Sequence, residues 1–164
     1  MMKGACVDVV EAVGNTPIVR LNRLGADVTA NIYVKLEYLN PGGSVKDRPA
    51  IQIIDDAEEA GTLRPGGTIV EATSGNTGIA LAMIAAERGY KVKIVRPCDM
   101  SEERRALLRM LGAELIEVDE GDFDGAILLK DQIVEKEGCF TLNQFSNPLN
   151  VECHYKTTFK ELLN

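Results

Sequence analysis

Residues 68–88, TIVEATSGNTGIALAMIAAER, divide into a strand, a loop and a helix. Residues 68–72 are mostly apolar and β-branched, which is typical of a buried strand. Residues 76–88 have the length and apolar content of a helix, and Gly89 follows in the position where helices often end in a left-handed turn. Residues 73–78 are therefore expected to form a strand-to-helix loop.

The same unit occurs twice more downstream. The sequence pattern predicts strands at residues 91–95 and 114–118, each followed by a helix, at residues 101–111 and 123–137. Strands that alternate with helices of this length pair in parallel, and the helices cover the sheet. The sequence therefore predicts an α/β fold with a parallel sheet covered by helices.

Further elements are expected on both sides of this region. Residues 17–21 and 31–37 are interpreted as strands near an edge. Residues 45–60 place apolar side chains on one face of a helix that Gly61 ends, and residues 150–163 resemble one amphipathic helix.

The composition argues against two classes of partner. The chain has 164 residues, 45% of them apolar, and a formal net charge of −7. Its basic residues are not clustered densely enough to neutralise phosphates, so no nucleic acid is expected as a partner. The longest apolar run, residues 79–86, is far shorter than the roughly 18 residues of a membrane span. Because residues 1–11 show no signal-peptide pattern, the expected location is cytoplasmic.

The cysteines and the single histidine, His154, do not form a metal-binding pattern. The four cysteines have no C-x-x-C spacing, and one histidine cannot build a histidine cluster. No metal site is expected, and structural roles are expected for these side chains.

A second informative stretch lies before the sheet region. Residues 41–48, PGGSVKDR, place Lys46 at the start of the helix predicted at residues 45–60. Free backbone N–H groups and the helix dipole create positive potential there, which disfavours an ammonium ion and favours the neutral amine. A neutral lysine amine can form a Schiff base with an aldehyde cofactor. The same pattern also fits an ordinary solvated lysine in a first helical turn.

The loop at residues 73–78, TSGNTG, has features of an anion site. It lies at the carboxyl end of a predicted parallel strand and opens a helix, where N–H, hydroxyl and amide groups can bind a carboxylate or phosphate. It also fits a strand-to-helix turn with good capping residues. A dinucleotide-binding loop is disfavoured because the glycine spacing does not match G-x-G-x-x-G.

Residues 143–150, NQFSNPLN, are rich in amides. Gln144 could donate a hydrogen bond to a substrate carboxylate, although asparagine and proline equally mark a plain turn.

Together these motifs resemble the cysteine synthases (O-acetylserine sulfhydrylases), fold type II enzymes that use pyridoxal phosphate. The resemblance covers residues 9–158 and rests on four segments in the same order. These are PGGSVKDR (41–48), EATSGNTG (71–78), RPCDMSEERRALLRMLGAEL (96–115) and NQFSNPLNVECHYKTT (143–158).

The resemblance implies roles for six residues. Lys46 would bond covalently to pyridoxal 5'-phosphate and later remove the α-proton of the amino-acid substrate. Asn76 would hydrogen-bond the phenolic oxygen of the cofactor. The substrate carboxylate would be bound by Thr73, Ser74, Thr77 and Gln144. The implied reaction forms L-cysteine from O-acetylserine and sulfide, with loss of acetate and an aminoacrylate intermediate.

The resemblance also implies a domain organisation. Residues 39–150 are expected to form the smaller α/β domain of the fold. Residues 1–38 would be an arm with strands packing on a larger second domain, and residues 151–164 would begin a helix leading to it, so both ends are expected to be poorly supported. Family members are about twice as long and carry further cofactor-binding segments. We therefore expect this chain to be the N-terminal part of a longer enzyme that forms a homodimer. The 164-residue chain alone is expected to be inactive.

Two functional alternatives remain open at this stage. Cystathionine β-synthase-like replacement on serine uses the same lysine and anion loop, as do the serine and threonine dehydratases. A truncated, catalytically inactive fragment is the other alternative.

Overall fold

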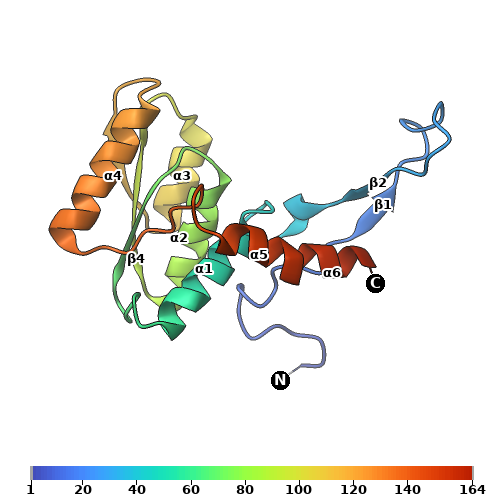
Figure 1. Cartoon of the computed structure of the whole chain (residues 1–164), viewed down its shortest axis with the longest axis horizontal. Coiled ribbons are helices and arrows are strands. Elements are labelled where there is room, and N and C mark those ends of the chain that lie inside the picture. Colours follow the sequence, from blue (N-terminus) through green and yellow to red (C-terminus); the bar gives the residue numbers. More distant parts are fainter. Residues whose placement is uncertain (1, 164) are drawn as a thin grey trace.

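A parallel three-stranded sheet forms the centre of the molecule. The computed structural model describes residues 2–163, and its central strands are β3 (Thr68–Ala72), β4 (Lys91–Pro97) and β5 (Glu114–Val118), in the order β3-β4-β5. Phe140 adds a parallel bridge to Ile69 on the free side of β3. The α/β architecture expected from the sequence is confirmed (Figure 1).

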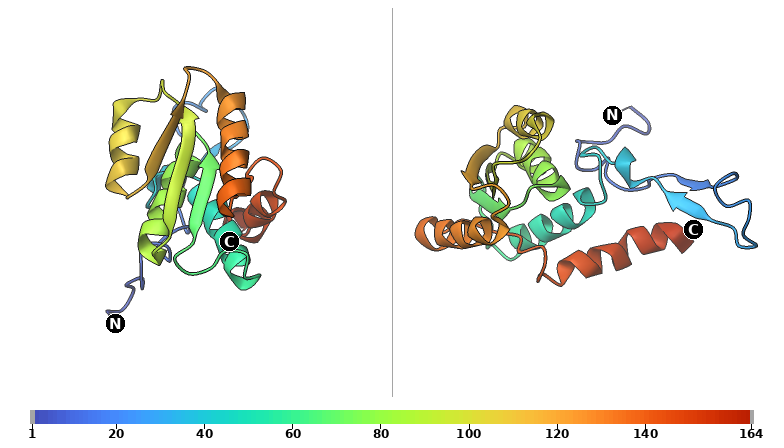
Figure 2. Two further views of the ribbon diagram at one scale, coloured as in Figure 1. Left: turned by 90° about the vertical axis from the view of Figure 1, so that its left-hand side faces the viewer. Right: turned by 90° about the horizontal axis from the view of Figure 1, so that it is seen from above.

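Helices cover both faces of this sheet (Figure 2). Ile69 and Ile94 belong to the apolar core under α1 (Asp47–Glu59), α2 (Asn76–Arg88) and α3 (Glu102–Met110). The neighbouring residues Val70 and Val95 face the other way, into a smaller core under α4 (Phe123–Glu137). Successive strand residues alternate between faces, so each strand contributes to two cores.

The predicted sheet and helix boundaries agree closely with the structure. The bounds of β3, α2, β5 and α4 match the predicted ranges. Strand β4 is two residues longer, because Arg96 and Pro97 pair with Glu117 and Val118 of β5. Gly89 ends α2 with a φ of 76°, in the left-handed region where glycine has no steric penalty.

The C-terminal region consists of two helices instead of the single helix expected. Helix α5 (Leu149–Lys156) and helix α6 (Thr158–Leu163) meet at Thr157. The hydroxyl of Thr157 donates to the carbonyl oxygen of Cys153 at 2.8 Å, and its φ of −119° and ψ of −76° lie away from the ideal α-helical values. Such side-chain bonding to the preceding turn favours a local break in a helix. Val151, Tyr155, Phe159 and Leu162 are exposed.

The N-terminal strands form a small sheet of their own. Strands β1 (Ile18–Arg20) and β2 (Tyr33–Lys35) pair with each other in an antiparallel ribbon, and within residues 2–163 neither pairs with the parallel sheet. The strands expected at residues 17–21 and 31–37 are thus present but shorter, and each is an edge of this separate two-stranded ribbon. Figure 1 shows the ribbon extending away from the α/β core, with α6 beside it. A one-turn 3-10 helix, η1 (Glu37–Leu39), leads from β2 toward α1.

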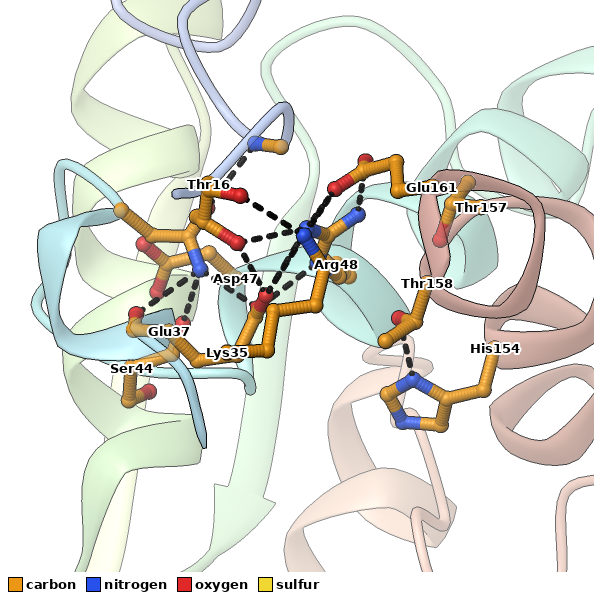
Figure 3. A network of polar contacts seen from close by, with 12 residues as sticks. Thr16, Lys35, Glu37, Ser44, Asp47, Arg48, His154, Thr157, Thr158 and Glu161 are labelled. Atoms are coloured by element: carbon orange, nitrogen blue, oxygen red, sulfur yellow. Dashed lines mark hydrogen bonds and ion pairs between the residues drawn. The ribbon is translucent and has the colours of Figure 1, made fainter. Parts of the chain in front are cut away.

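The two ends of the chain are joined by an ionic network centred on Arg48 (Figure 3). The guanidinium of Arg48 binds both oxygens of Glu37, at 2.7 and 2.9 Å, and both oxygens of Glu161, at 2.6 and 2.8 Å. Lys35 of β2 adds an ion pair with Glu161 at 2.6 Å. Two-pronged guanidinium–carboxylate contacts are strong and geometrically specific. These contacts link β2, η1 and α6 to the start of α1, and the expectation that both ends of the chain are poorly supported stays a prediction.

Among residues 2–163, no helix combines the length and apolar character needed to cross a bilayer.

Candidate functional site

A cavity of about 440 Å³ lies at the carboxyl ends of β3 and β4. Parallel sheets commonly bind ligands at this position. The structure brings all six residues singled out in the sequence to the wall of this one cavity. These are Lys46, Thr73, Ser74, Asn76, Thr77 and Gln144.

Lys46 occupies the residue position just before helix α1. Its backbone N–H donates to the hydroxyl of Ser44 at 3.1 Å, and its carbonyl accepts from the N–H of Ala50 at 3.2 Å. The tight turn that precedes Lys46 thus fixes its backbone, and its side chain is half-buried at the cavity.

Asp47 holds the glycine turn against the start of α1. Its carboxylate is fully buried and accepts a hydrogen bond of 2.6 Å from the N–H of Gly42. Burial raises the pKa of Asp47 to about 6, although the bond from Gly42 partly opposes this rise. A Cβ atom on Gly42 would lie only 2.8 Å from the carboxyl carbon of Asp47, so the turn requires glycine there.

The loop after β3 carries hydroxyl and amide groups to the cavity. The N–H of Thr73 donates to the carbonyl of Val95 at 3.0 Å, which ties the start of the loop to β4. The hydroxyl of Thr73 accepts from the N–H of Gly75 at 3.2 Å. Asn76 and Thr77 begin α2, the first exposed and the second buried. Exposed N–H groups at this helix start suit an anionic ligand.

Gln144 reaches the same cavity from the segment after Phe140. Its side-chain oxygen accepts a hydrogen bond of 2.6 Å from the hydroxyl of Thr77. Its backbone carbonyl accepts from the side-chain amide of Asn150 at 3.0 Å. The side-chain oxygen of Gln144 is therefore occupied as an acceptor by Thr77. The amide NH₂ is the other polar group of this side chain, and it can donate to a ligand.

Glu71 is a structurally important residue that sequence analysis did not identify. It is 3% exposed on β3, and its Oε2 accepts from the hydroxyl of Thr141 and the backbone N–H groups of Leu142 and Asn143. Burial raises the pKa of Glu71, and the hydrogen bonds and the charge of Lys130 oppose that rise. The available signal was a lone carboxylate in an apolar strand, since a buried charge requires partners.

The remaining wall of the cavity is apolar and includes Ala72, Val95, Pro97 and Ile127. Within residues 2–163, no group of three or more His, Cys, Asp or Glu side chains could hold a metal ion. The arrangement combines an amine, several hydrogen-bond donors and an apolar wall. It can therefore hold an organic ring with an anionic group and offer an amine to a reacting carbonyl or proton.

Comparisons with known proteins give consistent results. A family model described as pyridoxal-phosphate dependent enzyme matches residues 9–164. Cysteine synthase B of Salmonella typhimurium is 52% identical over 153 residues, which cover 93% of this chain and 50% of that protein. Cysteine synthase of Staphylococcus aureus is 48% identical over 157 residues, covering 95% and 51%.

A crystal structure of O-ureido-L-serine synthase matches with a TM-score of 0.89 and 46% identity, over 97% of this chain and 50% of that chain. The chain thus spans about half the length of the relatives that it matches.

Proposed function

The chain belongs to the family of pyridoxal-phosphate-dependent enzymes, and from this membership we propose that it carries the N-terminal part of the active site of a cysteine synthase. The observation that carries the proposal is the convergence of Lys46, the loop 73–77 and Gln144 on one cavity. These residues come from segments separated by up to about 100 positions, and packing alone does not require such a convergence.

The cavity residues fit pyridoxal phosphate. Ala72, Val95 and Pro97 provide an apolar wall suited to a planar aromatic ring. Lys46 presents an amine at the same cavity, and the exposed Asn76 presents an amide. Amines and amide donors match the aldehyde and the ring oxygen of this cofactor.

We propose that Lys46 holds the cofactor through its amine and later holds the proton taken from the α-carbon of the amino-acid substrate. When bound, pyridoxal phosphate withdraws electrons from that α-carbon, which makes the proton removable and lets a β-substituent leave. The backbone of Lys46 is held by Ser44 and Ala50, so its side chain extends from a defined position at the wall of the cavity. Asn76 would donate a hydrogen bond to the cofactor ring oxygen.

The substrate carboxylate is proposed to bind to Thr73, Ser74, Thr77 and Gln144. Hydroxyl and amide donors at a helix N-terminus stabilise a carboxylate, and the helix dipole adds to that effect. In this structure the Thr77 hydroxyl donates to the side-chain oxygen of Gln144. The substrate carboxylate would replace that oxygen as the acceptor.

We propose O-acetylserine and sulfide as the substrates, with cysteine and acetate as products. The two cysteine synthases at 48% and 52% identity support this assignment. The 46% identity to O-ureido-L-serine synthase favours a second candidate, in which the product carries a ureido group. Both candidates use a serine derivative with a substituent on the β-carbon.

The domain organisation expected from the sequence remains a proposal. We propose that residues 39–150 form the small domain and that residues 1–38 and 151–164 lie against the part of the protein that completes the relatives. Exposed apolar side chains on both flanks, such as Val19, Tyr155 and Phe159, support this arrangement. In the experiments below, "full-length enzyme" means the protein that contains both this chain and the remaining half.

The proposal is tested by product analysis with the full-length enzyme. Three substrate pairs are compared: O-acetylserine with sulfide, O-acetylserine with hydroxyurea, which would place the ureido group on the β-carbon, and serine with homocysteine. Fastest formation of cysteine from O-acetylserine supports the cysteine synthase assignment, whereas faster turnover of another pair replaces it. The 164-residue chain, assayed in parallel, is expected to be inactive.

A further inference from the structure

We propose that Glu71 is the positioning residue for Gln144, holding this side chain where the substrate carboxylate binds. The proposal rests on the proposed function, because it assigns Glu71 to the carboxylate side of that same site. Glu71 does not line the cavity that contains Lys46, so it acts through the segment that carries Gln144.

One oxygen of Glu71 binds three consecutive residues of this segment. Oε2 accepts from the hydroxyl of Thr141 at 2.9 Å, from the N–H of Leu142 at 2.9 Å and from the N–H of Asn143 at 3.2 Å. Gln144 is the next residue along the chain. The three bonds therefore fix the backbone direction with which the chain enters Gln144.

A buried lysine supports the same segment from helix α4. Lys130 is 5% exposed and donates to the side-chain oxygen of Asn143 at 2.9 Å. It also pairs with Asp131 at 2.7 Å. Asn143 has a φ of 49°, in the left-handed region where asparagine is among the better-tolerated residues. The contacts with Glu71 and Lys130 hold this unusual backbone conformation in place.

The position of Glu71 in β3 links the segment that carries Gln144 to the strand that leads into the loop with Thr77. Glu71 lies in β3, where it pairs with Ile94 of β4, and the preceding residue Val70 donates its N–H to the carbonyl of Phe140 at 2.8 Å. Strand β3 ends at Ala72, and the loop that carries Thr73 and Thr77 follows directly. Glu71 thus couples the two halves of the proposed carboxylate site, Thr77 on one side and Gln144 on the other, which are joined by a bond of 2.6 Å.

An acceptor is required at this position. Without it, the N–H groups of Leu142 and Asn143 lose their partner, and a buried N–H without a partner is unfavourable enough to shift a loop. We infer that loss of the acceptor moves Gln144 while the apolar cores under α1 and α4 persist.

The test uses three variants of the full-length enzyme. Glu71→Met keeps the length and removes the acceptor, Glu71→Gln keeps one acceptor oxygen, and Thr141→Val removes one donor. We expect the KM for the amino-acid substrate to rise about tenfold in Glu71→Met and about threefold or less in the other two, with kcat changed less than twofold. Equal effects of Glu71→Met and Glu71→Gln, or a loss confined to kcat, would overturn the proposal.

A double-variant comparison separates positioning from a general structural role. In a Gln144→Ala background, Glu71→Met is expected to raise KM by less than twofold, because the side chain that it positions is already gone. Additive effects of the two substitutions contradict the proposal.

A measurement independent of turnover is made on the 164-residue chain. In Glu71→Met, amide hydrogen exchange of Leu142 and Asn143 is expected to accelerate at least tenfold, while that of Ile94 in β4 stays unchanged. If the full-length enzyme turns over none of the substrates, the proposed function fails. Unchanged exchange at Leu142 and Asn143 in Glu71→Met overturns the role of Glu71, whatever the turnover experiment shows.

Discussion

The hydroxyl of Thr77 donates a hydrogen bond of 2.6 Å to the side-chain oxygen of Gln144, 67 positions further along the chain. This bond joins the start of helix α2 to the segment after Phe140 at the wall of the cavity. The Thr77 hydroxyl and the Gln144 amide group are both proposed to bind the substrate carboxylate. This contact places the two groups side by side, and groups that are adjacent before binding lower its entropy cost.

Replacing Thr77 by valine is expected to weaken both folding and substrate binding. Valine keeps the shape of the side chain, so the main loss is one hydrogen bond in a buried position, about 1 kcal/mol of unfolding free energy. Urea unfolding of the 164-residue chain measures this loss. In the full-length enzyme we expect the KM for the amino acid to rise, since the carboxylate loses one donor.

Thr62 provides a matched control for this substitution. Its hydroxyl donates to the carbonyl of Ala57 at 3.1 Å, and Thr62 is not part of the cavity wall. Because Thr62 is exposed, Thr62→Val is expected to cost less free energy of unfolding than Thr77→Val, with no change in KM. If both variants change KM equally, the assignment of Thr77 to the carboxylate site is wrong.

Lys46→Ala is expected to abolish covalent attachment of pyridoxal phosphate. The full-length enzyme should show a visible absorption band, and reduction with borohydride followed by peptide mass mapping should place the label on Lys46. Lys91, an exposed lysine at the start of β4, serves as the control. Labelling should fall at least tenfold in Lys46→Ala and stay unchanged in Lys91→Ala. A label spread evenly over several lysines would argue against a dedicated site.

Gly42→Ala is expected to disrupt the turn that positions Lys46. The added methyl group would meet the buried carboxylate of Asp47, and overpacking of this kind costs about 1–3 kcal/mol. Chemical unfolding of the 164-residue chain measures the cost, and labelling by pyridoxal phosphate in the full-length enzyme reports on Lys46.

Two comparisons identify the cause of this effect. Gly43 has a φ of 81°, and no atom lies within 4 Å of the position that a Cβ would take there, so Gly43→Ala should cost only about 1 kcal/mol of backbone strain. In an Asp47→Ala background the methyl group at position 42 has more room, and its cost should fall. A cost that is the same in both backgrounds would contradict the proposed clash.

Local patterns were sufficient to predict the central elements. In β3 and α2, the apolar strand, the helix length and Gly89 all agree, and the predicted bounds match the structure. The convergence of Lys46, the loop 73–77 and Gln144 is accessible from sequence because their order matches a known family. The parallel sheet then explains it, since the loop lies where its strands end.

Contacts between distant side chains were not accessible in this way. Glu71 binds residues about 70 positions away, and Arg48 binds Glu161 at a separation of 113. No local pattern of a single sequence specifies which carboxylate a buried guanidinium will meet. The break at Thr157 was missed for a related reason, because a threonine hydroxyl can point to solvent or bond to the preceding helical turn, and only packing decides.

The Glu161 carboxylate is expected to make the stability of the 164-residue chain depend on acid pH. Hydrogen bonds from Arg48 are the main cause that lowers the pKa of Glu161 to about 2, with Lys35 and the N–H of Asn15 adding to them and burial opposing them. An unfolded glutamate titrates near 4.3. Folding therefore favours the ionised form, so this contribution is fully present above about pH 4.5 and disappears as the pH falls toward 2.

Glu161→Gln should remove this contribution, about 1–3 kcal/mol after allowance for partial solvent exposure. Urea unfolding of both proteins between about pH 2 and 7 is expected to give free energies that differ most above about pH 4.5 and converge near pH 2. Glu152→Gln is the control, because Glu152 pairs with Lys156 at 2.5 Å on the exposed side of α5 and such surface pairs contribute little. Unfolding curves for Glu161→Gln that run parallel to those of the unmodified chain over the whole pH range would show that the Arg48 network does not stabilise the joined ends of the chain.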